Sequence, residues 1–316
     1  MDDRDHKNRI AVLLSTYNGE KFVSELIDSV LNQIDVNVHI FVRDDGSTDR
    51  TLDILNKYDP NDLTFFIGQN VGAANSFMKL IYEESVNGYS YYALADQDDI
   101  WFPDKLITAI HAIEENRNDL PVLYACNQKF VDEEGHDMGN RLPEEFAVPS
   151  IYNILFGNNL SGCTMVFNDL LRNELISKRA SEKMLQIRMH DLWIAVVASI
   201  TGEIIYDKNP HILFRRHGDN TSDGRTSSEI RKNRKIKDYI EVIKRSPEHP
   251  ASMVAEEILR MYSDKLACED KQKLSLLADY YTALSRKLKL LVNRELKEAW
   301  GVSKMTYYGK IILNRM

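Results

Sequence analysis

Three aspartates follow an apolar stretch at the end of the first third of the sequence, and together they could bind a cation. Residues 91–95 read Tyr-Tyr-Ala-Leu-Ala, and Asp96, Asp98 and Asp99 come soon after them. The apolar run is typical of a strand that is buried on both faces. Because side chains alternate along an extended chain, Asp96 and Asp98 can point the same way, as oxygen ligands of a divalent cation and a diphosphate must. Taken alone, the segment fits equally well a strand followed by an acidic turn that caps the next helix.

Polar turns also end three earlier apolar runs, at residues 9–15, 38–43 and 63–67. An amphipathic helical pattern follows each of these runs. The alternation predicts a parallel sheet with covering helices, whose ligand crevice lies at the carboxyl ends of the strands. Neither GxGxxG nor a P-loop occurs at any of these turns, so carboxylates, a cation and other side chains would have to hold a nucleotide.

Further elements are expected downstream. Apolar runs predict strands at 121–126, 164–168, 203–206 and 212–215, and helical spacing predicts helices after Pro103 and from about residue 188. Residues 131–150 are polar and loop-like. From about Thr221 the sequence becomes charge-dense and then helical to its end. We therefore expect an α/β domain over residues 1–220 and a helical extension over residues 221–316.

Composition narrows the class of protein. Of the 316 residues 43% are hydrophobic and 28% are charged, as in a soluble globular protein, and the net charge of −8 argues against nucleic acid as a partner. The three cysteines are widely spaced and suggest no disulfide framework, which favours a reducing compartment. The acidic N-terminus is unlike a signal peptide and no apolar run of 18 residues exists, so a cytoplasmic protein is expected.

The four polar turns, in this order and spacing, resemble those of the inverting glycosyltransferases of family 2. They are Thr16–Gly19, Asp44–Ser47, Asn70–Gly72 and Asp96–Asp99, and the resemblance covers roughly residues 8–220. It implies a GT-A fold, which is a Rossmann-like α/β fold with a mixed, mainly parallel sheet and flanking helices, here followed by a C-terminal helical region. Segments 98–106, 189–195 and 213–220 are similar to the bacterial rhamnosyltransferase branch. That branch implies transfer of L-rhamnose from dTDP-rhamnose to a cell-surface polysaccharide or a lipid-linked glycan.

The resemblance also implies roles for residues of the turns. An aspartate of the Asp44-Asp45 pair would accept a hydrogen bond from the imide N–H of uracil or thymine, although the pair could simply belong to a helix-capping turn. Gly72 would let the diphosphosugar approach the backbone closely. The nucleotide-sugar-binding set is Thr16, Tyr17, Asn18, Glu20, Asp44, Asp45, Gly72, Asn75, Asp96, Gln97 and Arg216.

A metal site and a general base follow from the same resemblance. Asp98 would ligate Mg²⁺ or Mn²⁺, and His217 would ligate the cation or contact the diphosphate, with Arg215 and Arg216 as rival groups for neutralising phosphate. Asp191, expected at a helix start, would take the proton of the attacking acceptor hydroxyl, or would merely cap that helix. Two tryptophans, Trp101 and Trp193, either stack on sugar rings or belong to the core.

The C-terminal part combines apolar helical spacing with positive charge. Between residues 286 and 315 eight Lys or Arg stand against Glu295 and Glu298. A basic amphipathic segment of this kind could lie on an anionic membrane, at the inner face of which the protein would then be found, or could pack on the catalytic domain or another subunit.

Other functions remain open at this point. A UDP-hexose could replace dTDP-rhamnose as the donor, because the motifs do not encode the sugar pocket. The apolar strand before Asp96 and Asp98 also resembles the nucleophile strand of haloacid-dehalogenase-type phosphatases, although there it comes first in the fold. A non-catalytic sugar-binding module is the third alternative.

Overall fold

The structure is a computed structural model and describes residues 9–116, 119–218, 249–300 and 304–316. Its described strands form one nine-stranded sheet with the order β3-β2-β1-β4-β8-β6-β9-β5, and β7 pairs with β6 outside this path. The strands are β1 (Arg9–Thr16), β2 (Asn37–Asp44), β3 (Leu63–Ile67), β4 (Tyr91–Asp96), β5 (Ile100–Trp101), β6 (Val122–Val131), β7 (Asp137–Asn140), β8 (Met165–Asn168) and β9 (Glu203–Arg215).

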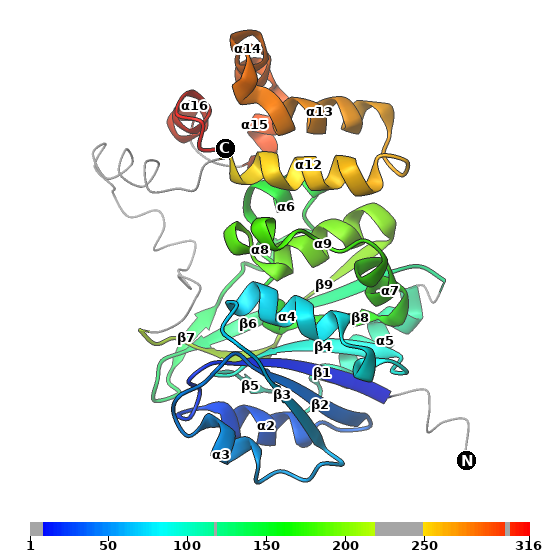
Figure 1. Cartoon of the computed structure of the whole chain (residues 1–316), viewed down its shortest axis with the longest axis vertical. Helices are drawn as coiled ribbons and strands as arrows, with labels where there is room; N and C mark the ends of the chain where they lie inside the picture. The colour runs from blue at the N-terminus through cyan, green and yellow to red at the C-terminus, as the bar shows by residue number, and fades with distance from the viewer. Residues whose placement is uncertain (1–8, 117–118, 219–248, 301–303) are drawn as a thin grey trace.

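Helices cover both faces of the sheet and continue beyond it (Figure 1). The helices near the sheet are α2 (Val23–Leu31), α3 (Thr51–Leu55), α4 (Ala73–Tyr82), α5 (Lys105–Asn116), α6 (Ile151–Gly157), α7 (Asp169–Ser177), α8 (Glu182–Ile187) and α9 (His190–Thr201). The C-terminal helices are α12 (Pro250–Tyr262), α13 (Cys268–Asp279), α14 (Leu284–Val292), α15 (Arg294–Trp300) and α16 (Lys304–Ile312), and single 3₁₀ turns lie at Glu84–Val86, Gly162–Thr164 and Tyr280–Thr282.

The first half of the sheet is parallel, as the sequence predicts. β1 pairs with β2 on one side and with β4 on the other, and β2 pairs with β3. This register places Thr16 beside Asp44 and Ser15 beside Asp96. The polar turns that follow these strands therefore meet at one edge, and the predicted α/β fold with a mixed, mainly parallel sheet is confirmed.

The second half of the sheet differs from the prediction in two places. Residues 131–150, expected to be a loop, contain β7, which forms an antiparallel pair with β6. The strands expected at 203–206 and 212–215 are one continuous strand, β9, which pairs in parallel with β6 and shifts register near Asn127. The polar residues that cross this shift interrupt the apolar pattern but not the strand.

Two layers of apolar side chains fill the space between sheet and helices. The residues of β1 that point to one face, such as Val12, pack with α2 and α5, whereas Leu13 points to the other face and packs with α4 and α9. This alternation explains why the strands that position the polar turns are apolar throughout, because both faces of the sheet are covered.

The C-terminal helices share the second of these layers. The Tyr262 ring of α12 lies 6.4 Å from the Trp193 ring of α9, and Trp300 of α15 stacks on Phe156 of α6 at 4.7 Å. One apolar core thus runs from the sheet through α9 to the C-terminal helices. This supports the alternative in which the C-terminal helices pack on the domain that contains the sheet. The predicted boundary between residues 220 and 221 lies outside the described residues.

Within the described ranges, no helix is long and apolar enough to cross a membrane. The described cysteines Cys126, Cys163 and Cys268 are all free, and the first two are buried.

The shared core gives a stability prediction. Ile258 of α12 is fully buried in it, so we expect Ile258→Ala to lower the free energy of unfolding by about 2–5 kcal/mol while unfolding remains a single transition. Urea denaturation followed by tryptophan fluorescence and by circular dichroism measures both. Val292→Ala, at a position that is 80% exposed, is the control and should change the free energy by less than about 0.5 kcal/mol. Two separate transitions would contradict a shared core.

Candidate active site

The turn after β2 is built around the buried carboxylate of Asp44. It accepts hydrogen bonds from the Thr16 hydroxyl at 2.9 Å, the Gly46 amide at 3.1 Å, and the Ser47 amide and hydroxyl at 2.8 and 2.6 Å. A carboxylate has about four acceptor positions, so this network fills those of Asp44. Thr16, which is also fully buried, acts here as part of the frame.

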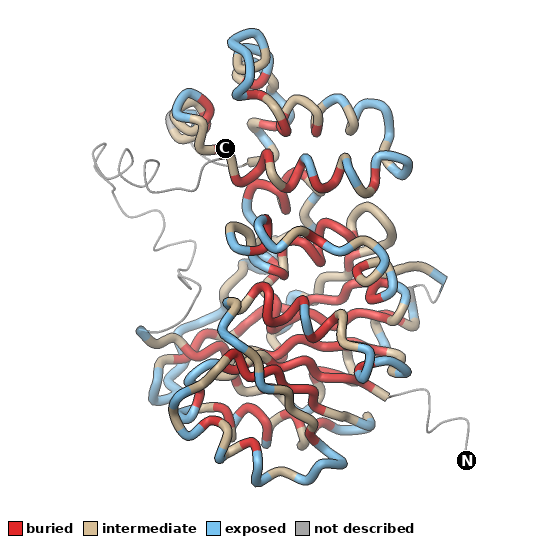
Figure 2. The backbone as a smooth tube through the Cα atoms, in the orientation of Figure 1, coloured by how far each residue is buried: buried red, intermediate tan, exposed pale blue. Residues whose placement is uncertain are grey.

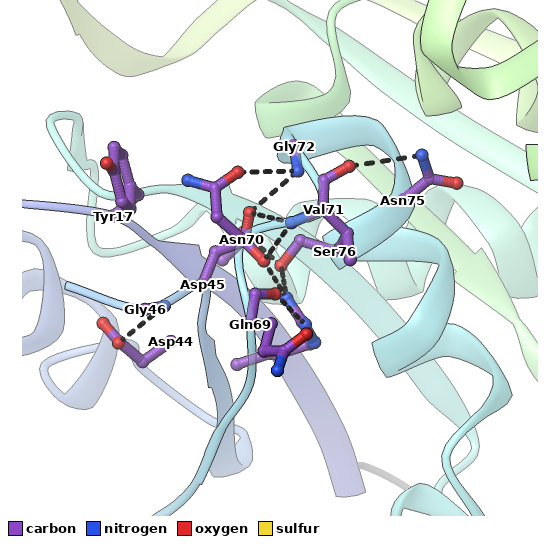
Figure 3. Close-up of polar contacts among 12 residues, drawn as sticks. Tyr17, Asp44, Asp45, Gly46, Gln69, Asn70, Val71, Gly72, Asn75 and Ser76 are labelled. Atoms are coloured by element: carbon purple, nitrogen blue, oxygen red, sulfur yellow. Dashed lines mark hydrogen bonds and ion pairs between the residues drawn. The ribbon is translucent and has the colours of Figure 1, made fainter.

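Asp45 connects the same turn to the start of α4 (Figure 3). Its carboxylate forms an ion pair with Arg43 and accepts the backbone N–H groups of Val71 at 3.0 Å and Gly72 at 2.9 Å. Gly72 has φ 81° and ψ 154°, a conformation that essentially only glycine adopts. The Val71 amide also lies 3.0 Å from the second carboxylate oxygen, so both oxygens of Asp45 are engaged within the turn, as those of Asp44 are.

The turn after β1 is tied to two neighbouring turns. The Gln97 side chain accepts from the Tyr17 amide at 2.9 Å and donates to the Tyr17 carbonyl at 3.1 Å. Asn18 accepts from the Thr48 amide at 2.8 Å, and the Glu20 carboxylate accepts from Arg50. The side-chain contacts of Asn18, Glu20 and Gln97 thus hold the turns together. Tyr17 is 47% exposed, and Figure 3 draws its ring in the same view as Asp44 and Asp45.

Asp96 and Asp99 crowd together at the end of β4. Their carboxylate oxygens and the Cys163 sulfur all lie within 4.8 Å of one another. Burial, followed by repulsion from Asp98, raises the pKa of Asp96 to about 7 and the pKa of Asp99 well above its ordinary value. Asp99 is 1% exposed, and α5 begins only at Lys105, so Asp99 lies in the protein interior and not at the start of this helix.

Lys105 supplies positive charge beneath this cluster. It is fully buried, donates to the Cys163 carbonyl at 2.6 Å, and lies 3.2 Å from the centre of the Trp101 ring. Burial lowers its pKa to about 8, against the attraction of Asp99 and Asp96 that raises it. Trp101 and Trp193 are buried, so the alternative that they stack on a sugar ring is wrong.

Asp98 and His217 face each other although 119 positions separate them in the sequence. The His217 ring nitrogen Nε2 lies 2.7 Å from Asp98 Oδ2, and both side chains are largely buried. Arg215 fixes this arrangement, because it donates to the Asp98 carbonyl at 3.3 Å and to the Glu133 carbonyl at 2.8 Å and pairs with Glu25 of α2. The Arg215 guanidinium is therefore buried and bound by groups of the protein itself.

Asp191 lies in the first turn of α9 rather than at its cap, which is Met189. Its carboxylate accepts from the Leu192 amide at 2.6 Å. Burial raises the pKa of Asp191, while the Leu192 amide, the positive charge of Arg141 and a hydrogen bond from Asn158 lower it in part. Asp191 is also close enough to Asp96 to raise the pKa of Asp96. The structure thus brings it to the edge of the sheet where β4 ends.

Comparison with known proteins decides the family. Residues 11–175 match Glycosyl transferase family 2. The chain belongs to this family. Its relatives include dTDP-rhamnosyl transferase RfbG of Shigella flexneri, 28% identical over 218 residues that cover 66% of this chain and 72% of RfbG. The Escherichia coli UDP-Glc:alpha-D-GlcNAc-diphosphoundecaprenol beta-1,3-glucosyltransferase WfaP is 22% identical over 72% of this chain and 85% of its own length.

The fold is shared with solved glycosyltransferases. The crystal structure of S. aureus TarS 1–349 in complex with UDP-GlcNAc aligns with a TM-score of 0.56 and 19% identity, covering 98% of this chain and 82% of that one. This likeness confirms the predicted GT-A fold. Membership of family 2 also removes the ground for the phosphatase alternative.

The structure brings some of the predicted site residues together at one edge of the sheet, whereas the side chains of others make contacts elsewhere in the protein. Asp96, Asp98, Asp191 and His217 meet at the carboxyl ends of the strands, as expected. Asn75 is buried and donates to the Val71 carbonyl at 3.3 Å, and Arg216 lies over the Phe130 ring at 5.6 Å. Lys105 and Arg141 were not predicted as site residues. Lys105 lies within segment 98–106, which is similar to the rhamnosyltransferase branch, whereas no pattern in the sequence pointed to Arg141.

The donor atoms at this edge fit a divalent cation. Family 2 and GT-A enzymes generally depend on one, and Mg²⁺ and Mn²⁺ prefer carboxylate oxygens, with imidazole also suited to transition metals. Asp98 and His217 present an oxygen and a nitrogen side by side, and the mutual repulsion of Asp96, Asp98 and Asp99 is what a bound cation relieves. The residues present therefore fit such an ion.

The raised pKa of Asp96 gives a pH prediction. Between its ordinary value and about 7 the folded state holds a proton that the unfolded state releases, so this group destabilises the protein increasingly as pH rises. We expect Asp96→Asn, measured in EDTA by urea denaturation, to be more stable than the wild type by about 2–4 kcal/mol at about pH 8 and by much less at about pH 5. Asp53→Asn on the exposed face of α3 is the control. A gain that is equal at both pH values would contradict the crowding of carboxylates.

Proposed function

We propose that this family 2 glycosyltransferase transfers L-rhamnose from dTDP-rhamnose to a growing cell-surface polysaccharide or a lipid-linked glycan, with inversion and with the help of a divalent cation. The similarity to a dTDP-rhamnosyl transferase over 66% of the chain supports the donor. The meeting of Asp96, Asp98, His217 and Asp191 at one edge of the sheet is the observation that carries the chemistry.

The nucleotide base binds at the turns after β1 and β2 in this proposal. An aspartate of the Asp44-Asp45 pair is the acceptor for the imide N–H of thymine or uracil, and both carboxylates also accept hydrogen bonds from the turns themselves. Tyr17 is exposed beside this pair and offers a ring for stacking. Gly72, with no side chain, leaves the start of α4 open to the diphosphate.

Asp98 and His217 would hold the Mg²⁺ or Mn²⁺ ion, and Asp96 would contact the ribose or the same ion. The ion neutralises negative charge on the departing nucleoside diphosphate. The positive charge of Lys105 offsets the carboxylates of Asp96 and Asp99, and Arg215 holds the Asp98 backbone through its hydrogen bond to the Asp98 carbonyl.

Asp191 is the general base in this proposal. The acceptor hydroxyl oxygen attacks the anomeric carbon from the side opposite the diphosphate, its proton passes to Asp191, and the bond to the diphosphate breaks. Burial raises the pKa of Asp191, which makes the carboxylate a stronger base than an exposed aspartate. Arg141, which donates to Gln128 at 2.8 Å, keeps the base ionised by its positive charge.

A direct test of the donor is calorimetric titration with dTDP-rhamnose, UDP-glucose and UDP-galactose, each with Mn²⁺ and with EDTA. We expect dTDP-rhamnose to bind with Mn²⁺ and to lose about tenfold or more in affinity in EDTA. Preference for a UDP-hexose would instead support the alternative donor, which the WfaP relative favours. Binding of none of them to folded protein would contradict the proposal, and binding without turnover of any acceptor would favour a non-catalytic module.

Replacing the base gives a kinetic prediction. Asp191→Asn keeps the shape of the side chain but cannot accept the proton, so we expect kcat to fall about 10²–10⁴-fold with little change in donor affinity. The control is Asp169→Asn, which removes the same charge from the first turn of the neighbouring helix α7. Single-turnover kinetics with labelled donor and calorimetry measure the two quantities. An equal loss in both variants would assign Asp191 a structural role at the helix start.

A further inference from the structure

Helix α14 presents an apolar stripe to the outside of the protein. Leu284, Leu288 and Val292 are 74%, 53% and 80% exposed, and their spacing of four residues places them on one face of the helix. The opposite face holds the buried Leu290, whose carbonyl accepts a hydrogen bond from Tyr307 of α16 at 2.7 Å. The inner face thus fixes the helix to the protein, while no other described residue covers the outer one.

Positive charges flank this stripe. Lys287 and Lys289 precede and follow Leu288, and neither forms an ion pair within the described ranges. Five Lys or Arg stand against two Glu between residues 284 and 300, although the whole chain carries −8. The local charge is therefore opposite in sign to that of the protein.

The stripe lies at an extremity of the molecule. Figure 1 shows α14 and α16 at the end opposite α2 and α3, and Figure 2 shows that the outer turns of both helices are exposed. Two apolar residues at the end of α16, Ile312 and Leu313, are exposed as well. The exposed apolar residues of α14 and of the end of α16 thus lie toward the same end of the described part of the protein.

We propose that the outer face of α14, defined by Leu284, Leu288 and Val292 with Lys287 and Lys289, docks on an anionic lipid bilayer. A helix with an apolar face and flanking lysines lies in the interface of such a bilayer, with its apolar side chains among the acyl chains and its charges at the headgroups. The negative headgroups complement Lys287 and Lys289. The end of α16 adds Ile312 and Leu313 to the same contact.

A second copy of the chain fits this face less well. In a two-fold dimer the same face would meet itself, which would bring the lysines of both copies together. Three side chains on a nine-residue helix also fall far short of the roughly 1,200 Å² that a stable interface buries. Charge and area together favour lipid.

The test is co-sedimentation of the full chain with vesicles of phosphatidylcholine alone or mixed with phosphatidylglycerol. We expect binding to the anionic vesicles only, falling as salt rises. Leu288→Gln combined with Val292→Gln should weaken binding about tenfold or more, and Lys287→Gln should weaken it about fivefold. Leu170→Gln, at an exposed apolar position of α7, is the matched control and should bind as the wild type does.

Each outcome bears on the proposal. Since the replaced side chains are exposed, circular dichroism and the unfolding midpoint should match the wild type, so that lost binding reflects the face itself. Absence of binding to anionic vesicles, or equal binding of all variants, would overturn the proposal. Sedimentation velocity that shows a wild-type dimer lost in the Leu288→Gln, Val292→Gln variant would identify a second copy as the occupant instead. Donor titration is a separate measurement, so failure of the proposed donor leaves this result unaffected.

Discussion

Repulsion among carboxylates at the end of β4 is the constraint on which the rest of this site depends. Asp96, Asp98 and Asp99 are crowded together with Asp191 close by, and burial followed by repulsion from Asp98 raises the pKa of Asp96 to about 7. Buried charges of one sign are tolerated only when other groups offset them. Here Lys105 lies below the cluster and Arg141 beside Asp191. The negative charge that remains on these carboxylates attracts a cation.

The polar turns around this cluster are held together by hydrogen bonds that do not need a ligand. Asp44, Asn18, Glu20 and Gln97 each connect one turn to another. A frame that is already connected loses little conformational freedom when a ligand arrives, which favours binding. It also divides the residues of these turns into those whose side chains build the frame and those, such as Tyr17, that are exposed.

Local patterns in the sequence predicted the strands and turns because their cause is local. Both faces of β1, β2 and β4 are covered, so each is apolar throughout, and the turn after each is rich in residues that favour turns. β7 was missed because a polar hairpin strand with no buried face carries no such pattern. The environment of Arg141 and the burial of Trp101 depend on residues distant in the sequence, so propensity and spacing cannot reveal them. The resemblance assigned Asp98 and His217 to one metal site, and the structure places their side chains 2.7 Å apart, whereas their binding of a cation stays a prediction.

The measurement that tests the central claim most directly is electron paramagnetic resonance of Mn²⁺ bound to the protein together with thymidine diphosphate, using protein labelled with ¹⁵N-histidine. The account predicts one bound Mn²⁺ ion with a nitrogen coupling from a single histidine, and predicts that His217→Gln removes the coupling. A bound ion that shows no histidine coupling, or a coupling that persists in His217→Gln, would contradict the role of His217 as a ligand of the cation.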